Sequence, residues 1–518
     1  MKKMNSSKPR LRPVFPTGQQ RGQALIFTLL FTAAAGLVGL MLFNSGLLAN
    51  TKSRLQNAAD AGAYSAGLLQ ARDQNFSAYT NRAMVANQVA VAQIVSLKSF
   101  LEDAADTKDR MGGIVLSIEA AIPVFKPLWT AELKNPAIPK EKALFDKLAP
   151  PTTKVLDVLI HAFETAQEAH HKATVIDMVL VADEVVKRND PLAKLSTGVF
   201  SVANTAVQVV AWDGYTKRHS ANDASPEADR FADVVVDKNS TDQFIRGRIS
   251  APDALWASIP NAIACPGGVP TATGFAFAHS GATQLSKDKK RWLGLDATLG
   301  GGFVTCIYMV GPIPVPVTYP LIDTIGNSGW MLGGSGGAVA GADGGYDSLN
   351  GYKNNPWTTK LFAGATIEPA GIYRYNWGGP GPTLDKAGGL QDYYRDVANP
   401  ISSIPSDQTP MQNGGAVPIS VEVERPASSI RTSSTLLPGS TEVKLDDQLA
   451  GNTMRALSKA HAYFYRSTTD SPAFTRTGWA RATDSKTEVA NLFSPYWQAR
   501  LVDVSVTERI ASFADQTK

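Results

Sequence analysis

The sequence predicts an α+β fold in three parts: a single N-terminal transmembrane helix, a helical stalk or bundle that continues from it, and a Gly/Pro-rich β-containing domain. Three observations predict this fold. A charge-free apolar run lies near the N-terminus, alanine-rich sequence follows it, and glycine and proline become frequent after about Ile249. With 518 residues, 44% of them hydrophobic and 19% charged, the chain is long enough for about two or three folded domains.

Positive charge is concentrated at the N-terminus. The first 21 residues carry six basic side chains and no acid, and subtracting this +6 from the formal net charge of +4 leaves −2 for the remainder. A near-neutral body argues against a nucleic-acid partner, because binding to phosphates needs a concentrated basic face. The six are Lys2, Lys3, Lys8, Arg10, Arg12 and Arg21.

The apolar run is long enough to cross a membrane. No charged residue occurs from Gly22 to Thr51, and Ala24–Phe43 is interrupted only by Thr28 and Thr32. These 20 residues, at about 1.5 Å each, match a hydrocarbon core of roughly 30 Å, and membrane lipid is an expected partner. A cleaved secretory signal is the alternative, but its apolar core is usually only about 7–15 residues long, which favours an uncleaved signal anchor.

The basic flank predicts the orientation of the chain. Lysine and arginine stay on the cytoplasmic side, so everything beyond about Leu48 is expected outside the cytoplasm. We therefore expect five regions: a cytoplasmic N-terminus at 1–22, a transmembrane helix at 23–48, a helical region at 49–248, a β-rich, Gly-rich region at 249–450, and a mixed C-terminal segment at 451–518 that packs on the body.

Two tracts around the span carry a family resemblance. Arg21-Gly22-Gln23-Ala24 precedes the span, and Leu55-Gln56-Asn57-Ala58-Ala59-Asp60-Ala61 follows it. Together, over about residues 20–67, they resemble the N-terminal module of the TadE/TadG-like Flp pilus-assembly proteins. Ala78–Asn87 and Asn491–Leu501 also look like tracts of envelope proteins of this group. The von Willebrand A domain that larger relatives carry is not recognisable here.

The resemblance implies a non-enzymatic component of Flp (tight-adherence) pilus assembly, or of related envelope machinery, in the bacterial inner membrane with a periplasmic body. Its partners would be other pilus-assembly or envelope proteins, and a helix-mediated oligomer is compatible with small residues in the span. Type IV prepilins keep a glutamate five residues after the cleaved glycine, whereas Gly22 is followed at that offset by Phe27, so we expect no such processing. The candidate helix-packing and assembly residues are Ala35, Gly36, Gly39, Leu55, Gln56, Ala58, Ala59 and Asp60.

Residues 80–212 are predicted to be mainly helical. Met84, Val91 and Val95 belong to a broad apolar surface that is typical of a buried helix. Pro150–Thr153 is predicted to start a new helix, and Leu195–Trp212 to form a core helix.

The second half of the chain reads as β structure with loops. Phe303–Tyr308 is a β-prone run between turn residues. Leu332–Gly351 is rich in glycine and is predicted to be a long exposed loop, and Asn452–Arg466 is predicted to be helical again. Cys265 and Cys306 are the two cysteines, and either a disulfide or two buried thiols fits the sequence.

Two patterns could carry chemistry. His161, Glu164, Glu168 and His171 share one helix face and imitate half of a carboxylate-bridged metal site, but no second copy occurs, so a solvated face is favoured. Gly333–Gly337 matches Gly-x-Ser-x-Gly and keeps an envelope hydrolase open as an alternative, although more glycine flanks it and His461 is the only later histidine. No phosphate loop or dinucleotide fingerprint occurs, so no cofactor is expected.

Aromatic residues near glycines leave a surface adhesin or binding module as a further alternative. Flat rings on exposed loops can bind sugars or proteins, but such residues more often fill the core of a small β domain. The aromatic residues are Tyr346, Tyr352, Trp357, Tyr373, Tyr375 and Trp377.

Overall fold

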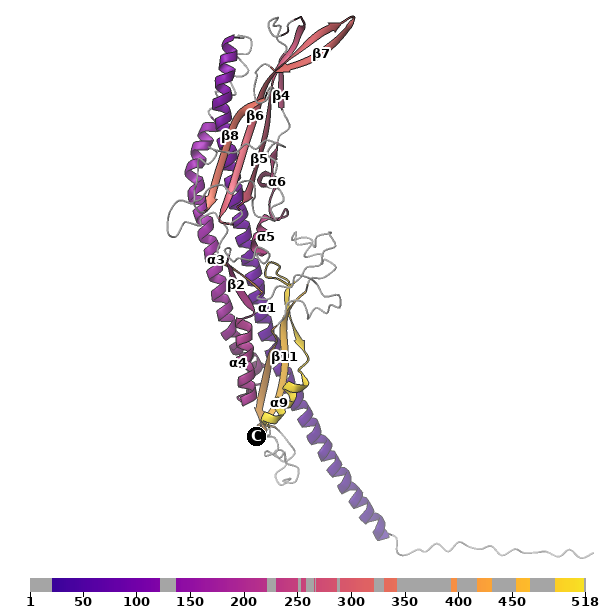
Figure 1. The fold of residues 1–518 in the computed structure, drawn as a ribbon. Coiled ribbons are helices and arrows are strands. Elements are labelled where there is room, and N and C mark those ends of the chain that lie inside the picture. The colour runs from indigo at the N-terminus through magenta and orange to yellow at the C-terminus, as the bar shows by residue number, and fades with distance from the viewer. Residues whose placement is uncertain are drawn as a thin grey trace, which may run out of the picture.

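The computed structural model describes residues 21–121, 137–220, 230–249, 253–257, 265, 267–286, 289–320, 330–341, 393–397, 417–430, 453–465 and 490–516. The described part is elongated and is built along one long helix, with strands packed on the upper two thirds of that helix (Figure 1). The α+β fold class is therefore confirmed.

Helix α1 (Arg21–Ala121) runs unbroken for 101 residues. Its first part projects from the body, and the rest carries the body along its side (Figure 1). The prediction that the apolar helix continues beyond the span is confirmed. Above the projecting part, Met84, Val91 and Val95 are buried as the apolar pattern predicts.

Helix α3 (Ala137–Asn189) lies antiparallel beside α1, as the two ribbons in Figure 1 show. Pro150 and Pro151 lie inside this helix, so the prediction that a helix starts there is wrong. Proline in a helix interior removes a backbone hydrogen bond. Packing on α1 keeps the earlier turns helical all the same: Ala149 is buried, and Asp146 forms an ion pair with the buried Lys98 of α1.

Helix α4 (Val199–Asp213) is not the core helix that its apolar sequence predicts. Only Ser201 and Trp212 are buried, and Val199, Val202, Val207 and Val210 are exposed. Leu195 lies outside the helix, in a short strand. The remaining helices are short: α5 (Arg230–Val236), α6 (Gln243–Arg246), α9 (Val506–Gln516) and a 3-10 turn at Ala427–Ser429.

Four antiparallel strands form the base sheet, which packs on α1 just above its projecting part (Figure 1). In spatial order they are β1 (Lys194–Leu195), β10 (Ile419–Pro426), β11 (Thr453–Phe464) and β12 (Trp497–Val502). The base sheet thus joins strands from the sequence regions 49–248, 249–450 and 451–518.

Strand β11 overturns the prediction of a helix at Asn452–Arg466. It pairs with β10 on one side and with β12 on the other, so its backbone groups find partners on neighbouring strands. Ala456, Ser458 and Ala460 are buried at every second position, which is the period of a strand.

The upper sheet lies further along α1 and contains β3 (Arg248–Ile249), β4 (Asp253–Ala257), β5 (Val269–Leu285), β6 (Arg291–Val310), β7 (Ile313–Pro320) and β8 (Trp330–Gly341). All of its pairings are antiparallel. Strands β2 (Thr216–Ser220) and β9 (Tyr393–Val397) pair separately. The predicted β-run at Phe303–Tyr308 lies in β6.

Strand β8 contradicts the first half of the predicted glycine-rich loop at Leu332–Gly351. Gly333–Gly341 lies in this strand and is largely buried between β6 and α1, whereas residues 342–351 lie outside the described part of the chain. This stretch forms a strand because its glycines allow the backbone of β8 to pass very close to α1. A methyl group on Gly334 would lie 2.5 Å from the Thr107 backbone nitrogen, so only glycine lets the strand pass so near the helix.

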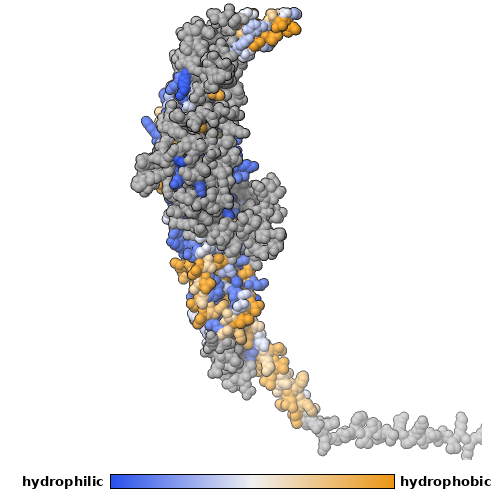
Figure 2. Space-filling view, viewed as in Figure 1, coloured by the Kyte–Doolittle hydropathy of each residue, from blue (hydrophilic) through white to orange (hydrophobic). Residues whose placement is uncertain are grey.

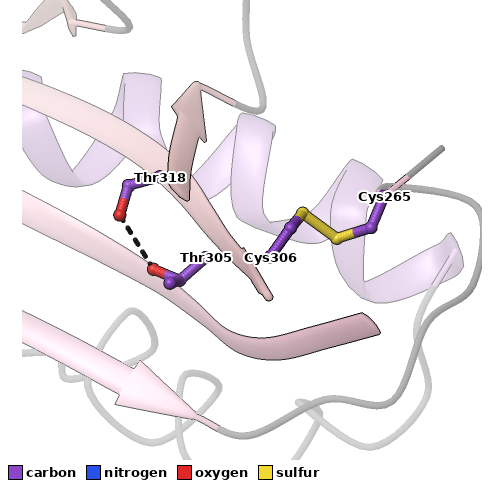
Figure 3. Close-up of a disulfide and its surroundings, with 4 residues drawn as sticks. All are labelled: Cys265, Thr305, Cys306 and Thr318. Atoms are coloured by element: carbon purple, nitrogen blue, oxygen red, sulfur yellow. Dashed lines mark hydrogen bonds between the residues drawn. A yellow bond between two sulfur atoms is a disulfide. The ribbon is translucent and has the colours of Figure 1, made fainter. Parts of the chain in front are cut away.

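A disulfide joins Cys265 to Cys306, with Cα atoms 5.8 Å apart (Figure 3). Cys306 lies on β6 near the start of the β6–β7 hairpin, which projects at the far end of the molecule (Figure 1). The hydroxyl groups of Thr305 and Thr318 are hydrogen-bonded at 3.0 Å across this hairpin (Figure 3). The cross-link therefore ties the hairpin to the chain before β5.

Candidate assembly site

The projecting part of α1 is a bare apolar surface. Within it, large side chains such as Phe31, at 77% exposure, contact nothing in the body, and hydrophobic residues cover it in Figure 2. By length and composition this helix can cross a membrane. Ala35 is exposed, and a methyl group on Gly36 or Gly39 would meet no atom within 4 Å. The small residues of the span therefore lie on an open surface.

The tract Leu55–Ala61 packs inside its own chain instead. Leu55, Ala58 and Ala59 are fully buried in a hydrophobic cluster with strands of the base sheet and with α3. Next to them, a methyl group on Gly62 would lie 2.8 Å from Val186 of α3. The small residues do allow a second helix to approach closely, and in this structure that helix is α3.

The polar residues of the same tract face a groove. Gln56 donates through Nε2 to Asp60 Oδ1 at 2.8 Å and to the carbonyl of Leu457 on β11 at 3.2 Å. These residues line one side of a groove of about 1030 Å³ between α1, β11, β12 and α9. The two parts of the candidate site thus differ. The small residues of the span are exposed, whereas in the tract beyond it the apolar residues are buried in the core and the polar residues line the groove.

Basic side chains dominate the floor of this groove. Arg500 donates from Nε to His461 Nε2 at 3.0 Å and lies over the ring of Tyr463. Burial, followed by the charges of Arg500 and Lys459, lowers the pKa of His461 to about 4. His461 is therefore neutral at pH 7 and accepts the arginine hydrogen bond.

Helix α9 forms the other wall with its polar side turned inward. Glu508 accepts from Lys459 Nζ at 3.1 Å, and Asp515 accepts from Arg455 Nη1 at 3.0 Å. Burial alone would raise the pKa of Glu508, but hydrogen bonds from Ser505, Lys459 and Ser420 lower it to about 2. The apolar side of α9, formed by Val506, Ile510 and Phe513, is exposed to solvent, and Phe513 lies at the edge of the groove.

Sequence reasoning missed this groove. Its charged residues come from α1, β11, β12 and α9, which are distant in sequence, so no local spacing connects Lys52 with Arg500 or Arg509. One local pattern could have indicated helix α9. Its apolar residues recur at offsets 0, 4 and 7, the period of an amphipathic helix: Val506, Ile510 and Phe513.

Two tracts noted for their resemblance to envelope proteins contact each other. The Asn81 side chain donates to the carbonyl of Leu492 at 2.7 Å, and Arg82 Nε donates to the carbonyl of Phe493 at 2.7 Å. Asn81 is fully buried. The near-terminal tract at 491–501 is therefore held on α1 by side chains of the tract at 78–87.

The four residues of the predicted metal face do not converge. His171 is buried and its Nδ1 lies 2.6 Å from Asp73 Oδ2 of α1, while His161 is half-exposed and Glu168 pairs with Lys172. The expectation of a solvated face is wrong for His171, because α3 turns this residue against α1. Within the described ranges, no three His, Cys, Asp or Glu side chains are placed to hold a metal ion.

Ser335, the serine of Gly-x-Ser-x-Gly, lies in the middle of β8 opposite Ala297. Its backbone N–H and its hydroxyl both lie within hydrogen-bond distance of Asp106 Oδ2 of α1, at 2.9 and 3.2 Å. A nucleophile elbow needs a strand-to-helix turn, which is absent at Ser335. His461 belongs to the base sheet. The aromatic residues Tyr346–Trp377 of the adhesin alternative lie outside the described residues.

Comparison with known proteins identifies the N-terminal segment. Residues 22–73 match the model of the Tad family, described as "Putative Flp pilus-assembly TadE/G-like". The match confirms the resemblance seen in the sequence, and it spans both the bare helix and the buried tract. No curated protein and no solved structure matches the chain.

Proposed function

From this match, we propose that the chain is a non-enzymatic component of Flp/Tad pilus assembly, anchored in the bacterial inner membrane by a single helix with the N-terminus in the cytoplasm and the body in the periplasm. The observation that carries the proposal is the extent of the match. Residues 22–73 contain the bare apolar part of α1 and the tract that fixes the body to it. The segment typical of the family is thus the anchor together with its attachment.

The energetics of the bare helix favour a membrane. Burying apolar surface is worth about 25 cal/mol per Å², so exposing some 20 apolar residues to water is strongly unfavourable. A helix satisfies its own backbone hydrogen bonds and therefore tolerates lipid. The basic residues before Gly22 favour the cytoplasmic side for the N-terminus.

Assembly would use the open small residues of the span. Ala35 and Gly39 are four residues apart and let another membrane helix approach closely, because helix association in lipid depends on close packing. Since α1 is continuous from the span into the body, a lateral contact in the membrane also positions the base sheet and the upper sheet. The chain would act as a rigid spacer with a membrane docking face.

Two features of Ser335 support a non-enzymatic role. It lies within strand β8 rather than at a strand-to-helix turn, and its hydroxyl is hydrogen-bonded to Asp106. The hydroxyl therefore lacks the geometry of an activated nucleophile. If Ser335→Ala abolished a hydrolytic activity of the purified protein, this part of the proposal would fail.

Accessibility of single cysteines tests the orientation. The chain has no free cysteine among the described residues, and its two cysteines form the disulfide, so a new thiol at Ser6 or at the exposed Leu192 would be the one reactive site. We expect a membrane-impermeant maleimide to label Leu192→Cys in intact spheroplasts and Ser6→Cys only after permeabilisation. The reverse pattern, or recovery of the protein in the soluble fraction, contradicts the anchor.

Substitution of Gly39 tests the assembly face. Gly39→Leu adds bulk that lipid tolerates but a close helix contact does not. We expect recovery of co-purifying pilus-system proteins to fall about tenfold, equivalent to roughly 1.4 kcal/mol, and piliation to be lost with it. Ala33→Leu, which adds the same bulk about 120° around the helix from Gly39, is the control and should leave both unchanged. Normal piliation after deletion of the whole gene would refute the proposed function.

A further inference from the structure

The groove beside α1 has the dimensions of a helix. Lys52, Gln56 and Asp60 line it at spacings of four residues, so it follows α1 for about 12 Å. Two turns of an α-helix span about 11 Å, close to this length. Strands β11 and β12 form its floor and α9 its far wall.

The groove is continuous with the bare part of α1. Extending the face of Lys52 and Gln56 downward at 3.6 residues per turn leads to Leu48, Met41 and Val38. Met41 and Val38 are exposed. A helix lying in the groove would therefore continue along α1 into the same apolar layer.

Helix α9 presents an apolar rim to that position. Val506, Ile510 and Phe513 are 72%, 63% and 66% exposed, and Phe513 lines the groove. Surface helices normally turn this side inward. Here the side of α9 that faces β11 carries Glu508 and Asp515, which form ion pairs with Lys459 and Arg455 of that strand. These ion pairs fix the orientation of α9 and keep its apolar side exposed.

The charge of the groove selects an acidic occupant. Lys52, Arg500 and Arg509 line it and have no acidic partner among the residues that the structure describes. Arg500 Nη2 is buried and makes no hydrogen bond with any residue in the described part of the chain. A buried guanidinium donor without an acceptor is costly, and a carboxylate is the group that matches its geometry.

Other occupants fit less well. A second copy would have to insert its own α1, but Leu55, Ala58 and Ala59 of that helix are buried in its own body. Lipid headgroups extend only about 5–8 Å beyond the hydrocarbon core, whereas the α1 wall of the groove runs from Lys52, about 6 Å beyond Leu48, to Asp60, about 18 Å beyond it. Most of the groove therefore lies above the lipid headgroups.

We propose that this groove binds the first two turns above the membrane of a helix from a different single-pass membrane protein, and that a carboxylate in those turns pairs with Arg500. The proposal rests on the membrane anchoring proposed above. The partner is thus apolar within the bilayer and acidic just outside it.

Photo-crosslinking in the living cell tests this. The full chain carries p-benzoylphenylalanine in place of Phe513, in the groove, or of Ile176, an equally exposed apolar residue of α3. We expect an adduct from Phe513 and none from Ile176, with the crosslink mapped by mass spectrometry to a segment directly after an apolar span that contains an acid. Arg500→Glu should lower the adduct yield at least tenfold, and Arg188→Glu, an exposed charge reversal on α3, should not.

A third crosslinking position separates this proposal from the proposed function. If Gly39 in the span crosslinks to a membrane protein but Phe513 does not, the groove proposal is overturned and the assembly role stands. An adduct from Phe513 with lipid, with a second copy or with a segment that lacks an acid also overturns it. Equal yields from the Arg500→Glu and Arg188→Glu chains would show that the carboxylate pairing is wrong.

Discussion

Gly336→Val is expected to destabilise the body by about 3 kcal/mol or more, because at this position β8 passes too close to α1 for a side chain. A Cβ atom at this position would lie 2.1 Å from the Ser99 carbonyl oxygen and 2.3 Å from the Asp103 backbone nitrogen. Both contacts are with backbone of a long helix, which cannot rotate aside as a side chain can. Overpacking of this kind typically costs about 1–3 kcal/mol or more. Urea unfolding of the full chain in detergent, followed by near-UV circular dichroism, measures the loss.

Gly247→Ala is the matched control for this prediction. The residue has extended backbone geometry, and the nearest atom to a new methyl group, Gln243 Nε2, lies 3.7 Å away. Its unfolding midpoint should match that of the unmodified chain, within about 0.5 kcal/mol. If Gly336→Val were equally stable, the close packing of β8 on α1 would be refuted.

Asp296→Ala is expected to cost about 3–5 kcal/mol, because it leaves a buried arginine without its counter-charge. Asp296 is fully buried and accepts from Arg248 Nε and Nη2 at 2.7 and 2.6 Å. It also accepts from His279 Nε2 at 3.1 Å, and the other ring nitrogen of His279 lies 3.0 Å from Asp103 Oδ2. The four residues join β3, β5 and β6 of the upper sheet to α1. Arg188→Ala, which breaks an exposed pair, should change stability by less than about 1 kcal/mol.

The same cluster predicts a pH dependence. Burial alone would lower the pKa of His279, but hydrogen bonds with Asp103 and Asp296 raise it to about 9. A raised pKa means that the stabilisation is complete below the unfolded value of about 6.5 and is lost as the pH rises towards 9. We expect the unfolding free energy to fall by about 2 kcal/mol over this window after allowance for solvent screening.

His279→Gln should flatten that dependence and is its control. His461 does not interfere, because its lowered pKa of about 4 confines its own contribution to loss of stability below about pH 6.5. Urea titrations of both chains at pH 6.5 and pH 9 give the comparison. An unchanged slope in His279→Gln would show that His279 is not the titrating group.

Several features could be predicted from the sequence because their signals are local. The apolar length of Ala24–Phe43 and the alanine-rich tract after it predict one continuous helix, and α1 is continuous. The spacing of Met84, Val91 and Val95 predicts a buried face, which the structure confirms. The motif pair around the span predicts the family match at residues 22–73.

The sequence by itself therefore determined the apolar helix, its buried upper face and the resemblance of its N-terminal module, since each depends on neighbouring residues within one element. Only the tertiary structure decided that Thr453–Phe464 is a strand and that the glycines of β8 are buried. It also decided that Lys52, Arg500 and Arg509 line one groove. The physical reason is that strands obtain their hydrogen bonds from segments tens of residues away, and groove and buried residues obtain their surroundings from segments up to hundreds of residues away. A local sequence period does not contain this information.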